Sequence, residues 1–385
     1  MNFYLLAQIF FYVMIVVAGY FFLLAATNVF DMRKRTSPPS IKSGPLVSVL
    51  VPVRNEEKQI ENCIASLQAQ DYANYEILII DDNSEDMTYE IIEKIAEQDK
   101  RVKAYKGKPL PSDWYGKPFA LDQLVSLANG EILIFTDADT IHSPTSISWA
   151  ITNMEALKAD FISGYVGQVL KTFGERFTVP VIFFLTGFLI PMFLGKFVKL
   201  GYFSLAVGQY IAVKKDVLVK TGGFAAVKNK TSEDVFMARH IKKSGYNTEF
   251  LDITNQVFCR MYTGYESAIK GIGKNIYDFF SKIPALLILN AFAIFCFFCL
   301  PLPILICSLV ASSLEFAHNP FLLQLVIVHI LYSLTWLILF IGRRINCLNT
   351  LAWPILHVNL LFMVLWSFYR TVSGRGFTWK DRIVT

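Results

Sequence analysis

Long apolar runs lie at both ends of the chain. Residues 3–27 carry no charge and are long enough to span a bilayer, and the basic segment "DMRKR" follows at residues 31–35. Because no basic residue precedes this run, it does not resemble a cleaved signal peptide. We expect residues 1–30 to be a transmembrane anchor, and the segment after it to lie in the cytoplasm, since basic flanks favour that side.

Three further apolar stretches lie in the C-terminal part, residues 283–385, at about 283–311, 321–341 and 350–368. One charged residue separates the first two and two arginines follow the second, so we expect these stretches to cross the membrane outward and back. A full crossing at 350–368 would export the basic residues of the tail, which are Arg370, Arg375, Lys380 and Arg382. We therefore predict an interfacial helix there, in a multi-pass protein of the cell membrane.

From Leu46 onward, short apolar runs alternate with amphipathic segments. "LVSVLVP", "YEILII" and "EILIFT" predict buried strands. Ile60, Ile64 and Leu67 recur at helical spacing, and "DMTYEIIEKIAEQ" and "PFALDQLVSLANG" predict two more helices. This alternation predicts an α/β fold with a mostly parallel sheet that binds ligands at the carboxyl ends of its strands.

The composition agrees with membrane segments around one folded domain. Of 385 residues, 54% are hydrophobic and the mean hydropathy is +0.43, which is too apolar for a single soluble domain. The net charge of +5 fits cytoplasmic membrane flanks or an anionic substrate. We expect no nucleic-acid partner, because the chain has no long basic run and no nucleic-acid-binding motif. Cys296 and Cys299 form a C-x-x-C inside an apolar run, where packing is favoured over metal binding.

The candidate chemistry begins with two aspartates at the end of a predicted strand. "EILIFT" runs into Asp137 and Asp139, which point to the same side if the strand geometry continues. Two neighbouring carboxylates repel each other unless a cation lies beside them. Mg²⁺ or Mn²⁺ is the expected cofactor, because such hard ions bind one or two carboxylates together with substrate phosphates, and a diphosphate leaving group needs that charge.

Acidic and basic residues also follow the other predicted strands. "PVRNEE", at 52–57, lacks the glycines of a dinucleotide-binding turn. The next strand ends at Asp81 and Asp82, and a helix cap does not explain two adjacent acids, so we expect at least one of them to bind a ligand. Lys117 precedes a predicted helix N-terminus, a region that favours anions, and is a candidate phosphate contact.

A further acidic pair lies where a helix is predicted to begin near Ser232. Glu233 and Asp234 fall in its first turn, where the helix dipole stabilises carboxylates, and capping alone would explain them. Beside a nucleotide and metal site, however, an ionised acid near a reacting hydroxyl is the natural general base.

Taken together, these motifs resemble the membrane-bound family-2 glycosyltransferases of the GT-A fold, a Rossmann-like fold of nucleotide-diphospho-sugar transferases. The motifs "PVRNEE", "DDNSED", "GKPFAL", "DAD" and "SED" occur in the family's order and approximate spacing. The resemblance implies a cytoplasmic GT-A domain over residues 46–265, with transmembrane helices at both ends.

The resemblance implies that the donor is a nucleotide sugar, with a UDP-sugar expected. Pro52, Arg54 and Glu56 would line the nucleoside pocket. Asp82 would bind the uracil base and Lys117 would face the diphosphate.

The resemblance also implies the residues of the reacting centre. Asp139, helped by Asp137, would hold the metal, and Arg260 would contact the diphosphate from the other side. Asp234 would be the general base. Attack of the acceptor on the anomeric carbon would then invert its configuration.

Departures from the family's sequence patterns limit the kinds of acceptor that we expect. Polysaccharide synthases carry Q-x-x-R-W, whereas in "QVFCRMYTGY" Gln256 is one residue too far from Arg260, and Met261 replaces the tryptophan. "RMYTGY", "DWYGKP" and "FTWKDR" are closer to the hopene-associated and carotenoid-pathway (diaponeurosporenoate) glycosyltransferases. Those enzymes, like ceramide glucosyltransferase, modify a membrane lipid, so we expect a membrane-lipid acceptor.

The acid at position 234 bears on the kind of acceptor. A hydroxyl must lose its proton as it attacks, whereas a carboxylate is already ionised and needs no base. Asp234 therefore favours a hydroxyl of a terpenoid or glycolipid, with a carotenoid carboxylate as the alternative. A polysaccharide synthase and an inactive membrane scaffold are further alternatives, and the intact Asp82, Lys117, Asp139 and Asp234 argue against the scaffold.

One more apolar stretch, residues 177–195, interrupts the α/β region. Asp139 and Asp234 must meet at one site, so this stretch cannot be a single crossing that separates them. Its two prolines and two glycines also fit a straight span poorly. We predict an interfacial or re-entrant segment that lets a lipid reach the site from the bilayer.

Overall fold

The computed structural model describes residues 3–187, 191–196, 198, 201–230, 232–279, 283–313, 320–373, 377–379 and 382–384. The chain forms two compact units. The helical unit comprises residues 1–30, 170–191 and 262–385, and the sheet unit comprises residues 31–169 and 192–261. The first helix, α1 (Phe3–Arg35), begins in the helical unit and ends in the sheet unit.

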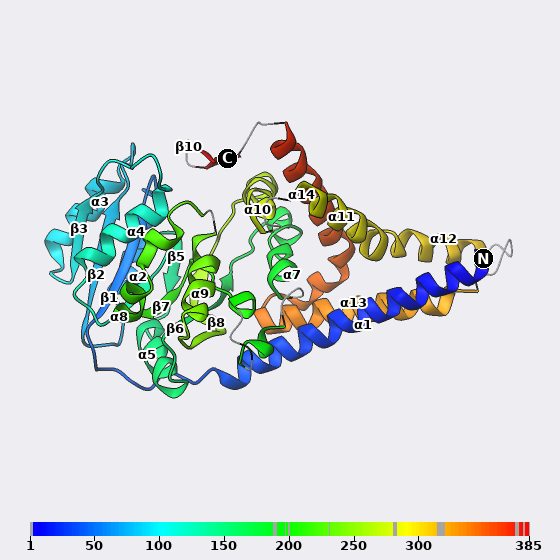
Figure 1. The fold of residues 1–385 in the computed structure, drawn as a ribbon, viewed down its shortest axis with the longest axis horizontal. Coiled ribbons are helices and arrows are strands. Elements are labelled where there is room, and N and C mark those ends of the chain that lie inside the picture. The colour runs from blue at the N-terminus through cyan, green and yellow to red at the C-terminus, as the bar shows by residue number, and fades with distance from the viewer. Residues whose placement is uncertain are drawn as a thin grey trace. The chain divides into compact units, whose positions relative to one another are not determined.

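An eight-stranded sheet forms the centre of the sheet unit (Figure 1). Its strands are β1 (Val47–Val53), β2 (Tyr75–Asp81), β3 (Val102–Lys106), β4 (Ile132–Phe135), β5 (Thr140–His142), β6 (Phe161–Gln168), β7 (Ile211–Lys214) and β8 (Thr248–Cys259). Their spatial order is β3-β2-β1-β4-β7-β6-β8-β5. Only β7 and β5 run against the others, so the mostly parallel sheet is confirmed.

The strand register brings several loops to one edge of the sheet. In parallel pairs, Val53 lies opposite Asp81 and Leu50 lies opposite Phe135, so β1, β2 and β4 end close together. The reversed strand β5 pairs with β8, with Thr140 opposite Cys259. The end of β8 therefore lies next to the turn that follows β4.

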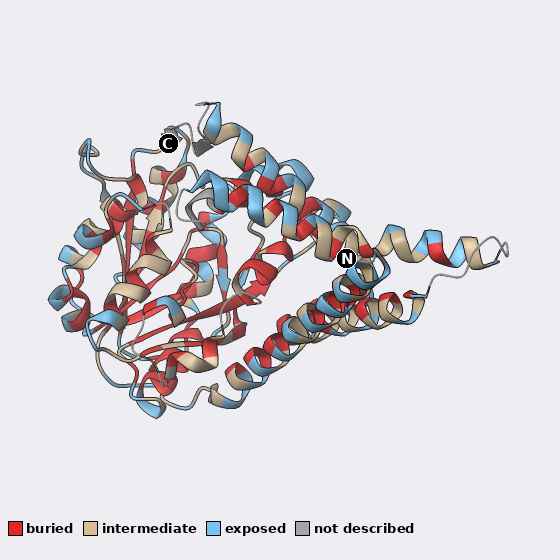
Figure 2. Cartoon of the chain, turned by 45° about the vertical axis from the view of Figure 1, so that its right-hand side comes forward, coloured by how far each residue is buried: buried red, intermediate tan, exposed pale blue. Residues whose placement is uncertain are grey.

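Helices cover both faces of the sheet. One face packs against α2 (Ile60–Gln68), α3 (Thr88–Gln98) and α5 (Ser146–Ala156). The other packs against α4 (Gly116–Leu127), α8 (Lys215–Lys220) and α9 (Glu233–Lys243). Val49 of β1 belongs to the first core and Leu50 to the second, and Figure 2 shows the strands buried between the two layers. Burial on both faces explains why these strands are continuous apolar runs.

The helical unit is built mainly of helices in its described part. They are α6 (Phe173–Arg176), α7 (Val181–Gly187), α10 (Tyr265–Phe279), α11 (Pro284–Ile294), α12 (Pro301–Ser313), α13 (Leu322–Arg343) and α14 (Trp353–Val372). A π-helical turn, Phe295–Cys299, joins α11 to α12, and β9 (Phe377–Trp379) pairs with β10 (Arg382–Val384). Short 3₁₀ helices occupy Met192–Lys196, Gly201–Phe203, Gly223–Val227 and Cys347–Ala352 along the chain.

Within the described ranges, four helical segments are long and apolar enough to cross a membrane. They are Tyr4–Arg35, Pro284–Ser313, Leu322–Arg343 and Cys347–Val372. Large apolar side chains on these helices are exposed, including Val16 at 70%, Phe292 at 65% and Leu323 at 69%. Such surfaces fit contact with lipid better than contact with water.

Two predictions about these segments remain open. In the stretch 177–195, α7 has seven residues and the 3₁₀ helix Met192–Lys196 has five, both too short to span a bilayer, and residues 188–190 lie outside the described chain. The stretch 350–368 is almost entirely within the continuous helix α14. Interfacial placement of both stays a prediction. In the basic tail, Arg375 and Lys380 lie outside the described residues.

Candidate functional site

The loops that follow β1 and β2 are joined by hydrogen bonds. Nη1 of Arg54 donates to the carbonyl oxygens of Asp82 and Asn83, at 2.7 and 2.9 Å. The backbone N–H of Glu56 donates to the first residue of α3. Pro52 lies in β1 just before these loops. The residues predicted to line a nucleoside pocket therefore gather at one edge of the sheet.

Both aspartates at the end of β2 are buried. Oδ2 of Asp81 accepts the N–H of Ser84 at 3.1 Å, whereas Oδ1 is buried without a hydrogen-bond partner within the described residues. Leaving a buried carboxylate oxygen unpaired is costly. A ligand N–H or O–H that reached this oxygen would be favourable, so Asp81 joins Asp82 as a candidate ligand contact.

Asp137 and Asp139 lie in a turn rather than on a continued strand. β4 ends at Phe135, and Oγ1 of Thr140 donates to the carbonyl oxygen of Asp137 at 2.7 Å. This bond closes the turn that leads into β5. The strand geometry therefore does not continue, but Ala138 is buried whereas both aspartates are partly exposed.

The surroundings of the Asp139 carboxyl group disfavour its ionised form. Burial raises its pKa to about 7, and the charges of Asp137 and Glu56 add to this rise. A hydrogen bond with the thiol of Cys259 and the charge of Lys117 act in the opposite direction. Oδ1 of Asp139 is buried and has no hydrogen-bond partner in the described part of the chain.

These observations fit a divalent cation held by Asp139 and Asp137. A cation would neutralise the repulsion and bind the unpaired oxygen. Over the described ranges, no group of three or more His, Cys, Asp or Glu side chains could hold a metal. The remaining coordination positions would therefore fall to substrate oxygens and water.

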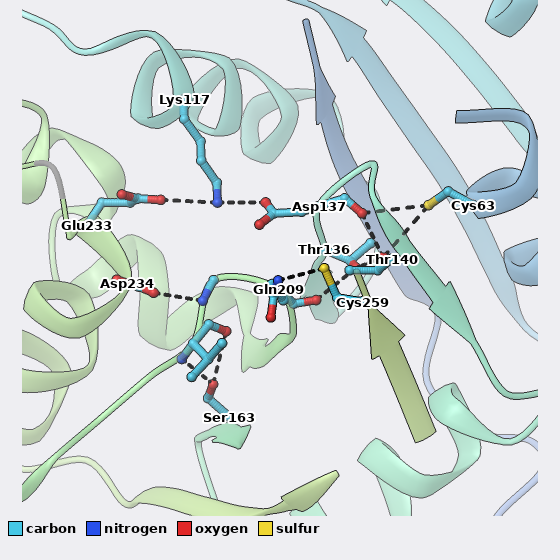
Figure 3. Close-up of polar contacts among 12 residues, drawn as sticks. Cys63, Lys117, Thr136, Asp137, Thr140, Ser163, Gln209, Glu233, Asp234 and Cys259 are labelled. Carbon is cyan, nitrogen blue, oxygen red and sulfur yellow. Dashed lines mark hydrogen bonds and ion pairs between the residues drawn. The ribbon is translucent and has the colours of Figure 1, made fainter. Parts of the chain in front are cut away.

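Lys117 lies in the first turn of α4, between acids from two other elements (Figure 3). Its Nζ is 2.6 Å from Oδ1 of Asp137 and 3.4 Å from Oε1 of Glu233. Burial alone would lower the pKa of Lys117, but the charges of these two acids outweigh it and raise the pKa. The ammonium group therefore stays protonated at neutral pH.

Glu233 and Asp234 open α9 beside Lys117. Burial raises the pKa of both carboxyl groups, that of Glu233 to about 7, while Lys117 lowers both. The carboxylate of Asp234 accepts the N–H of Gly208 at 2.7 Å and that of Val235 at 2.8 Å. Apolar side chains line the same cavity as these acids: Leu121, Phe135, Phe161, Ile211, Val213, Leu218, Phe224 and Met237.

Arg260 follows Cys259, the last residue of β8. Because Cys259 pairs with Thr140, the backbone of Arg260 lies next to the turn that carries Asp137 and Asp139. The sheet thus brings together residues from the ends of β1, β4 and β8 and from the starts of α4 and α9.

Two residues at the centre of this arrangement were not predicted to act there. Glu233 was attributed to capping, and its only signal was its place directly before Asp234. Gly208 gave no local signal, because it comes from the segment before the reversed strand β7.

Residues 48–222 match the family model of glycosyl transferase family 2. This match covers the central segment of the chain and agrees with the resemblance of its motifs to family-2 glycosyltransferases. The matched segment includes Lys117, Asp137 and Asp139, whereas Asp234 and Arg260 lie beyond it.

Parts of the chain are similar to curated proteins. The chain is 26% identical to the probable glycosyltransferase YdaM of Bacillus subtilis over 219 residues, which cover 55% of this chain and 50% of that protein. It is 38% identical to the beta-monoglucosyldiacylglycerol synthase of Trichormus variabilis over 97 residues, which cover 25% of this chain and 20% of that protein. The chain thus spans half or less of the length of the curated relatives it matches.

A solved structure resembles nearly the whole chain. It is the mannosyltransferase PcManGT from Pyrobaculum calidifontis, in complex with GDP-Man and Mn²⁺. The TM-score is 0.54 at 16% sequence identity, over 94% of this chain and 99% of that chain. At this identity the likeness concerns the fold, and it confirms the predicted GT-A fold with apolar helices in the N- and C-terminal regions.

Proposed function

We propose that this chain is an inverting glycosyltransferase that transfers a sugar from a UDP-sugar to a hydroxyl group of a membrane lipid. One observation carries the proposal. Within a family-2 glycosyltransferase domain, Lys117 links the turn that carries Asp137 and Asp139 to the start of α9, where Asp234 is located. A candidate cation site, a candidate phosphate contact and a candidate base would therefore lie side by side.

The donor would bind along the carboxyl edge of the sheet. Pro52, Arg54, Glu56 and Asp82 would line the nucleoside pocket, and Asp82 would accept a hydrogen bond from uracil. Lys117 would face the diphosphate, as its protonated state and its place at the N-terminus of α4 support.

Asp139, together with Asp137, would hold Mg²⁺ or Mn²⁺. When bound, the ion offsets the negative charge that accumulates on the diphosphate as the donor bond breaks. The unpaired Oδ1 and the raised pKa of Asp139 support this assignment. Arg260 would add positive charge to the same leaving group from the end of β8.

Asp234 would act as the general base. The acceptor oxygen attacks the anomeric carbon from the face opposite the diphosphate, and the bond between that carbon and the diphosphate oxygen breaks. The proton of the hydroxyl group passes to Asp234. Because this is one displacement, the anomeric configuration inverts. A carboxylate acceptor would need no base, so an acid here supports a terpenoid or glycolipid hydroxyl over a carotenoid carboxylate.

A lipid acceptor agrees with the character of the helical unit. Its helices expose large apolar side chains, and four helical segments in the described chain can span a bilayer. The relative from Trichormus variabilis is named as a synthase of a glucosyl lipid. We place the protein in the cell membrane as a multi-pass protein, with the glycosyltransferase domain in the cytoplasm.

The test is to incubate membranes that contain the protein with a panel of radiolabelled nucleotide sugars and to identify the labelled lipid by mass spectrometry. We expect one sugar on a lipid hydroxyl, with the anomeric configuration opposite to that of the donor. Membranes with Asp139→Asn are the matched control. A polymeric product, or no label in any lipid, would contradict the proposal.

A further inference from the structure

The segment Val207–Gln209, which leads into β7, is hydrogen-bonded to Asp234 (Figure 3) and lies next to Lys117. The N–H of Gly208 donates to Oδ2 of Asp234 at 2.7 Å. We infer that this segment is a positioning element of the active site, which sets the place of the Asp234 carboxylate and of the Lys117 ammonium. The inference rests on the function proposed above.

The first observation concerns space. A Cβ atom added at Gly208 would lie 3.0 Å from Nζ of Lys117 and 3.3 Å from Oδ2 of Asp234. Both separations are tighter than ordinary van der Waals contact, so any side chain at this position would displace one of the two charged groups. A glycine here leaves room for an ammonium and a carboxylate to lie against the same peptide unit.

The second observation is that the segment is fixed on both sides by buried hydroxyl groups. Oγ of Ser163 accepts the N–H of Val207 at 2.9 Å. Oγ1 of Thr136 donates to the carbonyl oxygen of Gln209, also at 2.9 Å. Both hydroxyl residues are buried, so these bonds are shielded from competing water.

Thr136 also joins two parts of the site. It directly precedes Asp137, and its hydroxyl holds the segment whose glycine binds Asp234. A single side chain therefore couples the turn that carries the candidate metal ligands to the candidate base. The same hydroxyl contacts Oγ1 of Thr140 at 2.9 Å and Nε2 of His142 at 3.0 Å, so a change at Thr136 acts on the turn as well as on the segment that binds Asp234.

The consequence for Asp234 has a definite sign. A hydrogen bond to the ionised form of an acid lowers its pKa, so weakening the bond from Gly208 raises the pKa of Asp234. The other charges that face Asp234 come from Lys117, Asp137 and Glu233, and the variants of Thr136 replace none of these residues. Since the base must be ionised, the acid limb of the rate profile moves to higher pH.

The experiment compares Thr136→Val, Thr136→Ser and Gly208→Ala in the full-length protein, with UDP-sugar transfer measured across pH. We expect Thr136→Val and Gly208→Ala to lower kcat about tenfold or more, because small misplacements of reacting groups are costly. Their acid limbs should move to higher pH, and for Thr136→Val the donor KM should stay within about twofold. Thr136→Ser keeps the hydroxyl and should retain the wild-type profile.

Thr221→Val is the control for the loss of a buried threonine hydroxyl, since that hydroxyl donates to carbonyls of Val217 and Leu218 outside the site. It should leave the profile unchanged. If Thr136→Val and Gly208→Ala keep the wild-type kcat, the inference is wrong. It is also wrong if their kcat falls at every pH while the acid limb of the pH–rate profile stays in place. In either case the proposed sugar transfer is unaffected. If the wild-type protein transfers no sugar, the proposed function fails, and the inference with it.

Discussion

Lys117 and Asp137 form an ion pair, with Nζ and Oδ1 2.6 Å apart. The residue expected to meet the diphosphate thus binds one of the two carboxylates expected to meet the cation. The ammonium group supplies positive charge to Asp137, while Oδ1 of Asp139 has no hydrogen-bond partner among the residues that the structure describes. We therefore expect Lys117 and a cation to compete for Asp137 until a diphosphate offers both of them further oxygen atoms.

This competition predicts opposite effects of Lys117→Met on two ligands. Binding of the nucleotide sugar should weaken about tenfold or more, because a charge-assisted hydrogen bond is lost. Binding of Mn²⁺ alone should strengthen, because Asp137 is freed. Calorimetry measures both. Lys103→Met, which removes a lysine 2.7 Å from Glu76 in another part of the sheet unit, should change neither. A loss of affinity for both ligands would contradict the competition.

Asp139→Asn should abolish transfer and sharply weaken metal-dependent donor binding. The amide lacks the negative charge that holds a hard cation. Transfer to lipid and donor binding with and without Mn²⁺ are the measurements. Asp216→Asn, which changes an acid 59% exposed at its side chain on α8, is the control and should behave as the wild type. Normal transfer by Asp139→Asn with added Mg²⁺ or Mn²⁺ would refute the metal assignment.

Asp234→Asn should lower turnover by at least ~10²-fold while donor binding stays nearly intact, because a positioned base contributes ~10²–10⁴-fold to rate. Asp122→Asn, which alters a half-buried acid on α4, serves as the control. Normal turnover by Asp234→Asn would remove the base assignment. A base-labile sugar ester as the product would favour the carotenoid-acid alternative instead.

The raised pKa of Asp139 predicts how the stabilising effect of metal depends on pH. A carboxyl group whose pKa is about 7 when folded and ~4 when unfolded binds more protons in the folded state, so stability falls as pH rises between these values. Mn²⁺ binds the ionised form and should therefore raise Tm more at pH ~8 than at pH ~6. Thermal unfolding in detergent measures this. In Asp139→Asn, the rise in Tm with Mn²⁺ should no longer differ between the two pH values. An equal rise in Tm at both pH values in the wild type would contradict the prediction.

The predicted topology can be tested with cysteines that are introduced one at a time into a background that lacks the exposed Cys307 and Cys347. Ser313→Cys, at the end of α12, should react with an impermeant thiol reagent from outside intact cells. Ser373→Cys, directly after α14, should stay unlabelled if that helix is interfacial and the tail is cytoplasmic. Comparable labelling of both positions would mean that α14 crosses the membrane.

Sequence reasoning found the residues whose places follow from local rules. The carboxyl ends of parallel strands meet at one edge of a sheet, which is why the loop of Arg54, the turn of Asp137 and the end of β2 could be expected together. Lys117 and Asp234 followed from their places at the starts of predicted helices.

The remaining features depend on contacts between distant segments. Gly208 meets Asp234 only because β7 enters the sheet in reverse beside β4, and no local pattern signals that pairing. The apolar run before Asp137 is compatible with either a longer strand or a turn. The hydrogen bond from the hydroxyl of Thr140 to the carbonyl oxygen of Asp137 determines that a turn forms. Glu233 differs from an ordinary capping residue only through Lys117, 116 positions earlier in the chain.

The chain crosses between its two units at residues 30/31, 169/170, 191/192 and 261/262. Trimming the polypeptide from both ends therefore cannot yield the catalytic half alone, because residues 170–191 stay inserted in it. A water-soluble catalytic fragment would need this insert replaced by a short polar link as well. The same interleaving means that a single crossover between two genes cannot exchange either unit as an intact block.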